Sequence, residues 1–131
     1  IKPSKEIEPD QVVKIQLKGL MNNNNPYMDV GIEQTWELAH PKNKKYTGPL
    51  EKFKKMLKGE TFYMLVGHKE HQIEQVYLNE TVATFLVTIL DSDKNYYKFK
   101  WQVEKYINEG PLKDCWLTTA VSQPVSLGSS I

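Results

Sequence analysis

The sequence predicts a single α+β domain in which three N-terminal helices pack in the concavity of a curved antiparallel sheet of about five strands. As far as Gly59, apolar residues recur every three to four positions, which is typical of helices. After Gly59 they recur every second position, which is typical of strands. The concave face of a curved sheet must be covered, and only the helices are available to cover it, so the expected shape is a cone.

Length and composition fit one globular domain. We expect an extended N-terminal arm at 1–8, the domain itself at 9–123 and a flexible, Ser/Gly/Pro-rich tail at 124–131. The formal net charge of +1 lacks the basic excess of nucleic-acid-binding proteins, so no nucleic-acid partner is expected. No segment approaches the ~18 consecutive apolar residues of a membrane span, so membrane association is expected only peripherally, through a complex.

The first helix is predicted over residues 9–21, because Pro9 suits a first helical turn and apolar residues follow at helical spacing. Its buried stripe is expected at Val13, Leu17, Leu20 and Met21, and its other sides at Lys14, Gln16 and Lys18. The asparagines at 22–25 and the proline after them end this helix in a loop.

Two more helices are predicted before Gly59. The first of them covers residues 31–39, where Ile32, Trp36 and Ala39 share one face, and a turn at 40–43 follows it. The other begins after Thr47-Gly48-Pro49, which supplies a capping hydroxyl and a proline for the first turn. Its buried stripe is expected at Leu50, Phe53 and Leu57, with lysines on the outside.

Five strands are predicted over residues 62–66, 72–78, 81–90, 97–103 and 115–121. The fourth is the clearest, because Tyr97, Phe99, Trp101 and Val103 alternate strictly with Lys98, Lys100, Gln102 and Glu104. Such alternation indicates a sheet with one buried face and one face that is wet or covered by a partner. The segment 67–71 is expected to be a solvated turn, and 91–95 a hairpin loop.

This order of elements resembles the nuclear-transport-factor-two-like superfamily, a group of cystatin-like α+β cones. Within it, the chain is similar to a domain family of photosynthetic organisms and bacteria that has no assigned activity. The resemblance spans most of residues 9–123 and includes structural motifs at 12–17, 31–32, 36–43, 47–49, 53–57 and 115–121. His40 stands where that family carries serine. The resemblance implies the fold and carries over no activity.

No catalytic, metal-binding or cofactor-binding motif is found in the sequence. Enzymes built on such cones use a carboxylate or histidine with a second acid, and the available groups are Asp29, His40 and Tyr97. His68 and His71 lie three residues apart without a third metal ligand at suitable spacing. We therefore expect no catalytic residue, no metal and no cofactor. Cys115 is expected to be a small buried hydrophobic residue.

Two regions are candidate binding sites. Aromatic residues at Tyr63, Tyr97, Phe99 and Trp101 either fill the cone or line an apolar ligand pocket. A basic run that includes Lys44, Lys45, Lys52 and Lys55 is either a solvated helix face or a surface for an acidic protein, anionic lipid or RNA.

Three functions follow from these observations. The first is a non-catalytic interaction module, either a homodimer through its open sheet face or an accessory subunit of an organellar assembly. The second is a small-molecule-binding protein that uses the cone. The third is an isomerase- or dehydratase-like enzyme, which requires Asp29, His40 and Tyr97 to meet in one cavity. The compartment stays open: an intracellular location is expected, and a start at Ile1 allows removal of a mitochondrial or chloroplast targeting peptide.

Overall fold

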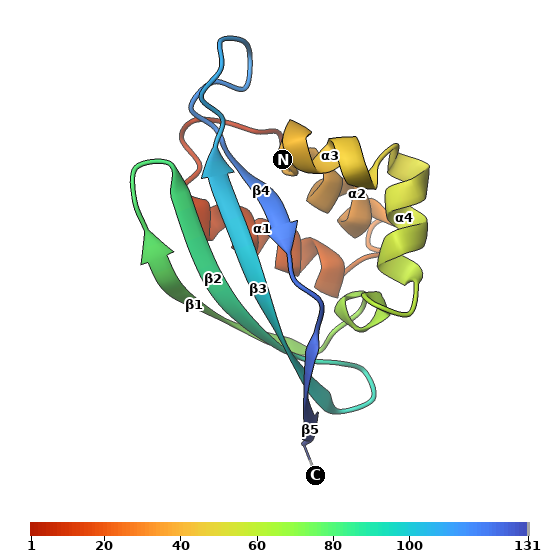
Figure 1. The fold of residues 1–131 in the computed structure, drawn as a ribbon. Helices are drawn as coiled ribbons and strands as arrows, with labels where there is room; N and C mark the ends of the chain where they lie inside the picture. The colour runs from red at the N-terminus through yellow and green to blue at the C-terminus, as the bar shows by residue number, and fades with distance from the viewer. Residues whose placement is uncertain (131) are drawn as a thin grey trace.

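The computed structural model describes residues 1–130 and shows the predicted α+β class: helices in the N-terminal half pack against a curved antiparallel sheet that does not close (Figure 1). The helices are α1 (Pro9–Met21), α2 (Val30–Glu37), α3 (Pro41–Thr47), α4 (Leu50–Lys58) and the 3₁₀ helix η1 (Tyr63–Leu65). The strands are β1 (Glu70–Leu78), β2 (Val82–Leu90), β3 (Asn95–Lys105), β4 (Trp116–Val121) and β5 (Val125–Ser129).

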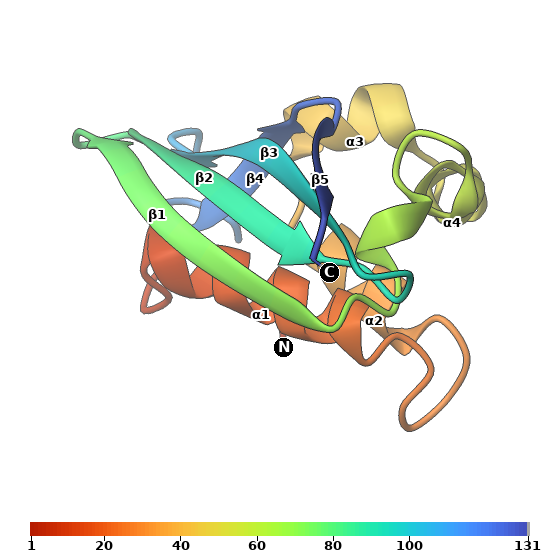
Figure 2. The same ribbon diagram turned by 90° about the horizontal axis from the view of Figure 1, so that it is seen from below.

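The sheet is built around the long strand β3. β1, β2 and β3 follow one another as antiparallel neighbours, and the far edge of β3 is shared by β4 and β5. The inner face of β2 and β3 is fully buried and consists of Ala83, Phe85, Val87, Ile89, Phe99, Trp101 and Val103. The alternation predicted for β3 is confirmed at Phe99, Trp101 and Val103. Figure 2 shows α1 and α2 along one face of the sheet, with α3 and α4 beyond the β4 and β5 side.

α3 differs from expectation, since the sequence predicts only a turn at 40–43. Pro41 occupies its first turn, and the His40 ring caps it by accepting a hydrogen bond from the Lys42 N–H at 3.0 Å. No residue of α3 is buried, so the helix has no apolar stripe that a periodicity argument could detect. The described residues therefore hold four α-helices instead of three.

Two segments after Gly59 also differ from expectation. The predicted strand at 62–66 is the short helix η1 with its flanks, because a short apolar run has no period that separates strand from helix. The expected flexible tail contains β5. β4 pairs only with residues 101–105 of β3, which leaves residues 95–98 of that strand free to pair with β5. The last residue of that tail, Ile131, lies outside the described residues.

The asparagine loop after α1 fixes where α2 begins. The Asn23 side chain accepts a hydrogen bond from the Ile32 N–H at 2.9 Å and donates one to Asp29 Oδ1 at 3.0 Å. α2 then crosses α1 so closely that a Cβ on Gly31 would lie 1.8 Å from the Gly19 carbonyl oxygen. The contact is possible only because residue 31 has no side chain.

Replacing Gly31 with alanine should therefore force α1 and α2 apart. We expect Gly31→Ala to lower the free energy of unfolding by roughly 3 kcal/mol, at the upper end of overpacking costs. Gly59→Ala is the matched control, since its nearest neighbours lie at 3.4 Å, and it should cost less than about 1 kcal/mol. Urea denaturation of both variants measures the difference, and equal stabilities would contradict this account of the helix crossing.

Candidate functional site

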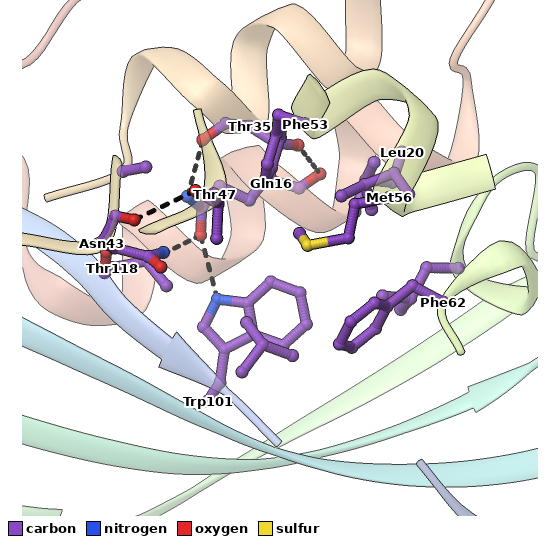
Figure 3. Close-up of a pocket in the computed structure, with 14 residues that line it drawn as sticks. Gln16, Leu20, Thr35, Asn43, Thr47, Phe53, Met56, Phe62, Trp101 and Thr118 are labelled. Atoms are coloured by element: carbon purple, nitrogen blue, oxygen red, sulfur yellow. Dashed lines mark hydrogen bonds between the residues drawn. The ribbon is translucent and has the colours of Figure 1, made fainter. Parts of the chain in front are cut away.

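The helices and the sheet line a partly open cavity of about 260 Å³ (Figure 3). Every α-helix contributes to its wall, together with η1, β3 and β4. Most of the wall is apolar and is formed by Leu20, Ala39, Phe53, Met56, Leu57, Phe62, Leu65, Trp101 and Val121. The polar lining residues are Gln16, Thr35, Asn43, Thr47 and Thr118. None of these lining residues is charged.

Gln16 organises the polar end of the cavity. Its side chain is 1% exposed and joins α1 to three other elements. Nε2 donates to the Thr35 carbonyl at 3.1 Å, while Oε1 accepts from the Trp101 indole N–H at 2.9 Å and from the Thr118 hydroxyl at 2.6 Å. Each polar atom of the amide has a partner, so its burial carries no unsatisfied-group penalty.

Asn43 and Thr47 of α3 form a second polar group, which is held by fewer and longer hydrogen bonds than Gln16. The Thr47 hydroxyl donates to the Asn43 backbone carbonyl at 3.1 Å, and Asn43 Nδ2 reaches the Thr118 carbonyl at only 3.5 Å. Within residues 1–130, Asn43 Oδ1 accepts no hydrogen bond. The amide lies beside the Gln16, Trp101 and Thr118 network in Figure 3. This end of the cavity therefore offers an acceptor and a weakly held donor.

Aromatic packing holds the apolar end in shape. Phe62 stacks on Phe99 with ring centroids 6.5 Å apart, and Phe53 packs against Trp36 at 5.2 Å. Such pairs add to the stability of a core beyond the area that they bury. The Phe62 and Phe53 rings, which line the cavity, are therefore held in place by Phe99 and Trp36.

Of the four residues predicted to line a pocket, only Trp101 lines this cavity. Phe99 is buried behind Phe62. Tyr63 is 47% exposed, and Tyr97 lies beside it, where partial burial and the Tyr63 hydroxyl raise the pKa of Tyr97. Most residues that line the cavity come from the helical half of the chain, whereas the prediction placed three of the four lining residues on one strand.

Asp29, His40 and Tyr97 do not meet in a common cavity, since none of them lines it. Asp29 accepts a hydrogen bond from Lys58 Nζ at 2.6 Å, which lowers the pKa of this carboxyl. His40 caps α3 and packs against Tyr106 at 5.4 Å, and its burial lowers the pKa of the imidazole. Asp29 and His40 thus have structural partners, and the arrangement that an isomerase-like enzyme would need is not formed by the described residues.

The four lysines of the predicted basic surface differ in their surroundings. Lys44 lies over the Trp36 ring at 5.1 Å, and partial burial lowers the pKa of its ammonium group. Lys52 reaches the Tyr46 carbonyl at 3.5 Å. Lys55 is exposed on α4, and Lys45 lies in the last turn of α3. Behind them Lys54 pairs with Glu33 and Glu51, so acidic groups neutralise part of this face.

The segment that holds His68 and His71 is not the solvated turn predicted. His68 is 1% exposed, its Nδ1 lies 2.7 Å from the Leu65 carbonyl, and its Nε2 lies 2.9 Å from His71 Nδ1. Because a carbonyl only accepts, His68 Nδ1 carries the proton and His68 Nε2 accepts from His71. Burial lowers the pKa of both rings.

Metal ligands and the single cysteine add no further site. Within residues 1–130, no group of three or more His, Cys, Asp or Glu side chains is placed to hold a metal ion. Cys115 is buried and unpaired, and burial raises the pKa of its thiol, so the thiolate is disfavoured.

Comparison with known proteins gives no match: no family model, no curated protein and no solved structure matches this chain. Among the described residues, no helix has the length and apolar character that crossing a bilayer requires.

The pair formed by the buried His68 and the half-buried His71 predicts a pH-dependent stability. The ordinary histidine pKa is 6.5, and the folded protein holds both rings below it, so the unfolded chain binds more protons near that pH. Stability should be complete above about pH 7.5 and fall by about 1–2 kcal/mol as the pH drops to about 5.5.

Denaturant titrations at several pH values measure this dependence. Replacing both rings in His68→Gln/His71→Gln should flatten the slope and leave only the smaller part due to His40. A stability that stays constant or rises as the pH drops between these values would contradict the proposed neutral pair.

Proposed function

We propose that the chain binds a small, neutral, mainly apolar molecule that carries one hydroxyl or amide group. The observation that supports this is the division of the cavity into an apolar body and one hydrogen-bonding end. Ligand sites are generally concave and apolar, with a few polar groups that fix the orientation of the ligand. Asn43 and Thr47 supply such groups here.

The volume sets the size of the ligand. If each non-hydrogen atom takes about 30 Å³, the share of a water molecule in the liquid, then 260 Å³ accommodates about nine such atoms. A substituted benzene ring is of this size, and its flat face would fit against the Trp101 indole and the Phe62 ring. Larger cofactors would not fit.

The lining favours a neutral ligand. A buried carboxylate or ammonium group is costly unless an opposite charge pairs with it, and no charged side chain lines the cavity. A hydroxyl or amide, by contrast, can donate to Asn43 Oδ1 and accept from Asn43 Nδ2. The ligand's polar group should therefore lie at α3, next to Thr47.

Binding without chemical conversion is the role that these residues support. General acid–base catalysis needs a titratable side chain within hydrogen-bonding reach of the reacting group. The lining contains amides, threonines and an indole, none of which titrates near neutral pH. The expected organellar accessory subunit stays a separate prediction, for which the basic face offers weaker support because part of it is neutralised.

Benzyl alcohol and benzamide are suitable probes, with benzoate and toluene as matched comparisons. We expect the two neutral polar probes to bind with dissociation constants near the millimolar range, which is reasonable for ligands of this size. Toluene should bind more weakly and benzoate not measurably. Amide chemical shifts in NMR titrations measure all four and should locate the perturbed residues around the cavity.

Two variants separate cavity binding from surface binding. Val121→Phe places a larger side chain in the cavity and should abolish binding. Val125→Phe, at an exposed position on β5, should leave binding unchanged. Asn43→Leu should remove the preference for benzyl alcohol over toluene. If none of the probes shifts cavity resonances, or if Val125→Phe acts like Val121→Phe, the proposal is wrong.

A further inference from the structure

We infer that α3 is a movable lid over the cavity, and that the His40 ring holds this lid closed only while the ring is neutral. The observation is that a helix with no buried residue carries two side chains of the cavity wall and is capped by an imidazole. The inference rests on the proposed function, because the lid would regulate entry and release of the proposed ligand. Movement of the lid can nevertheless be measured without any ligand.

α3 covers one end of the cavity without being packed into the core. Asn43 and Thr47 line the cavity from this helix, beside the Gln16 network (Figure 3). No residue of α3 is buried, so burial of apolar surface contributes little to holding the helix in place. A helix of seven residues is also too short to be stable on its own. The position of α3 therefore depends on individual polar contacts.

The contacts that hold the first turn of α3 to the rest of the chain differ in strength. The Lys42 ammonium group lies 3.5 Å from the Glu104 carboxylate, and Asn43 Nδ2 lies 3.5 Å from the Thr118 carbonyl. Contacts of this length are weak, and exposed ion pairs contribute little. The shorter bonds involve His40, whose N–H donates to the Thr118 carbonyl at 2.8 Å and whose ring accepts from the Lys42 N–H at 3.0 Å. His40 is thus the main fastening of the lid.

Only a neutral His40 ring can form the cap. An imidazole nitrogen accepts a hydrogen bond only when it carries no proton, so Nδ1 is unprotonated in the closed lid and the proton lies on Nε2. Protonation turns both nitrogens into donors and removes the cap. It also places a positive charge at the N-terminus of a helix, where the peptide dipoles disfavour it. A protonated ring therefore favours the open lid.

The surroundings of His40 couple the ring to a second contact of α3. Two charged groups face the ring, Lys42 from α3 and Glu104 from β3. Tyr106 packs against it at 5.4 Å, and β4 contributes the uncharged Thr118 carbonyl. Burial lowers the pKa of His40, Glu104 raises it and Lys42 lowers it, with a net lowering. An imidazolium would repel Lys42 and compete with it for Glu104, so protonation would weaken this ion pair as well as the cap.

The direction of the pH dependence follows from this environment. An open lid exposes His40 to water, which returns its pKa toward the ordinary value of 6.5. The open state therefore binds more protons than the closed state, and opening becomes more favourable as the pH falls below about 7. For one group with this ordinary pKa, a change from about pH 7.5 to about pH 5.5 can raise the ratio of open to closed molecules by at most about tenfold.

Hydrogen exchange of α3 amides, measured by NMR on the ligand-free chain, tests the inference. The Lys44 N–H donates to the His40 carbonyl and the Gly48 N–H donates to the Lys44 carbonyl, both at 2.9 Å. Protection of these two amides reports how often the helix opens. After correction for the intrinsic exchange rate, their protection should fall about five- to tenfold between about pH 7.5 and about pH 5.5.

Substitutions of the three histidines isolate the cap. His40→Asn keeps a side-chain acceptor that does not titrate, so its α3 protection should stay within about twofold over this pH range. His40→Ala has no acceptor, and its protection should lie about fivefold below that of the natural chain at about pH 7.5. Both variants lose the contact with Tyr106, so the difference between them measures the cap. His68→Gln/His71→Gln is the control and should keep the pH-dependent fall in α3.

Binding of benzyl alcohol at the same two pH values completes the test. The probe bonds to α3 only when the lid is closed, so its dissociation constant should rise about twofold or more at about pH 5.5 in the natural chain and stay constant in His40→Asn. Equal α3 protection at both pH values, an equal fall in His40→Asn, or an affinity that does not change would overturn the inference. Absence of binding at about pH 7.5 would contradict the proposed function instead, and exchange in the ligand-free chain would still decide whether His40 controls α3.

Discussion

The buried side chain of Gln16 is the interaction on which the arrangement of helices and sheet depends. One amide on α1 hydrogen-bonds to α2, β3 and β4 at distances of 2.6–3.1 Å. Because a buried amide left without partners is costly, the positions of Thr35, Trp101 and Thr118 are defined relative to α1 and not merely by hydrophobic packing. An apolar residue at position 16 would remove these three hydrogen bonds, and α1 would no longer be fixed in position relative to α2, β3 and β4.

The cavity follows from this network and from one backbone contact. Thr118 accepts a hydrogen bond from the His40 N–H at 2.8 Å and donates one to the Leu38 carbonyl at 2.9 Å. A short parallel bridge between Ala39 and Thr118 ties the chain to β4 just before α3. α3 and α4 lie beyond the β4 and β5 side of the sheet (Figure 2). The space left between them and Trp101 is the cavity, and Asn43 and Thr47 face it because they lie one turn apart on α3.

Much of the fold could be predicted from the sequence, because α1, α4, β2 and β3 have strong periodic patterns. α3 could not, since none of its residues is buried, and η1 could not, since five apolar residues in a row have no distinctive period. β5 depends on the length of β3, which leaves an unpaired edge that only the assembled sheet shows.

The candidate site was predicted less well. Trp101 follows from the alternation in β3, but Gln16 was expected on an outer side of α1 because it is polar. Its spacing of four residues from both Val12 and Leu20 is the signal that places it on the buried face. Asn43 and Thr118 give no such signal, since their roles depend on contacts between segments about 75 residues apart in sequence.

The Gln16 network holds open a cavity with an apolar interior. Diffraction from crystals pressurised with xenon tests it most directly, because xenon enters apolar cavities without needing hydrogen bonds. We expect a xenon atom among Met56, Phe62 and Trp101, with the Gln16 hydrogen bonds unchanged. A structure in which these side chains close the space and no xenon binds there would contradict it.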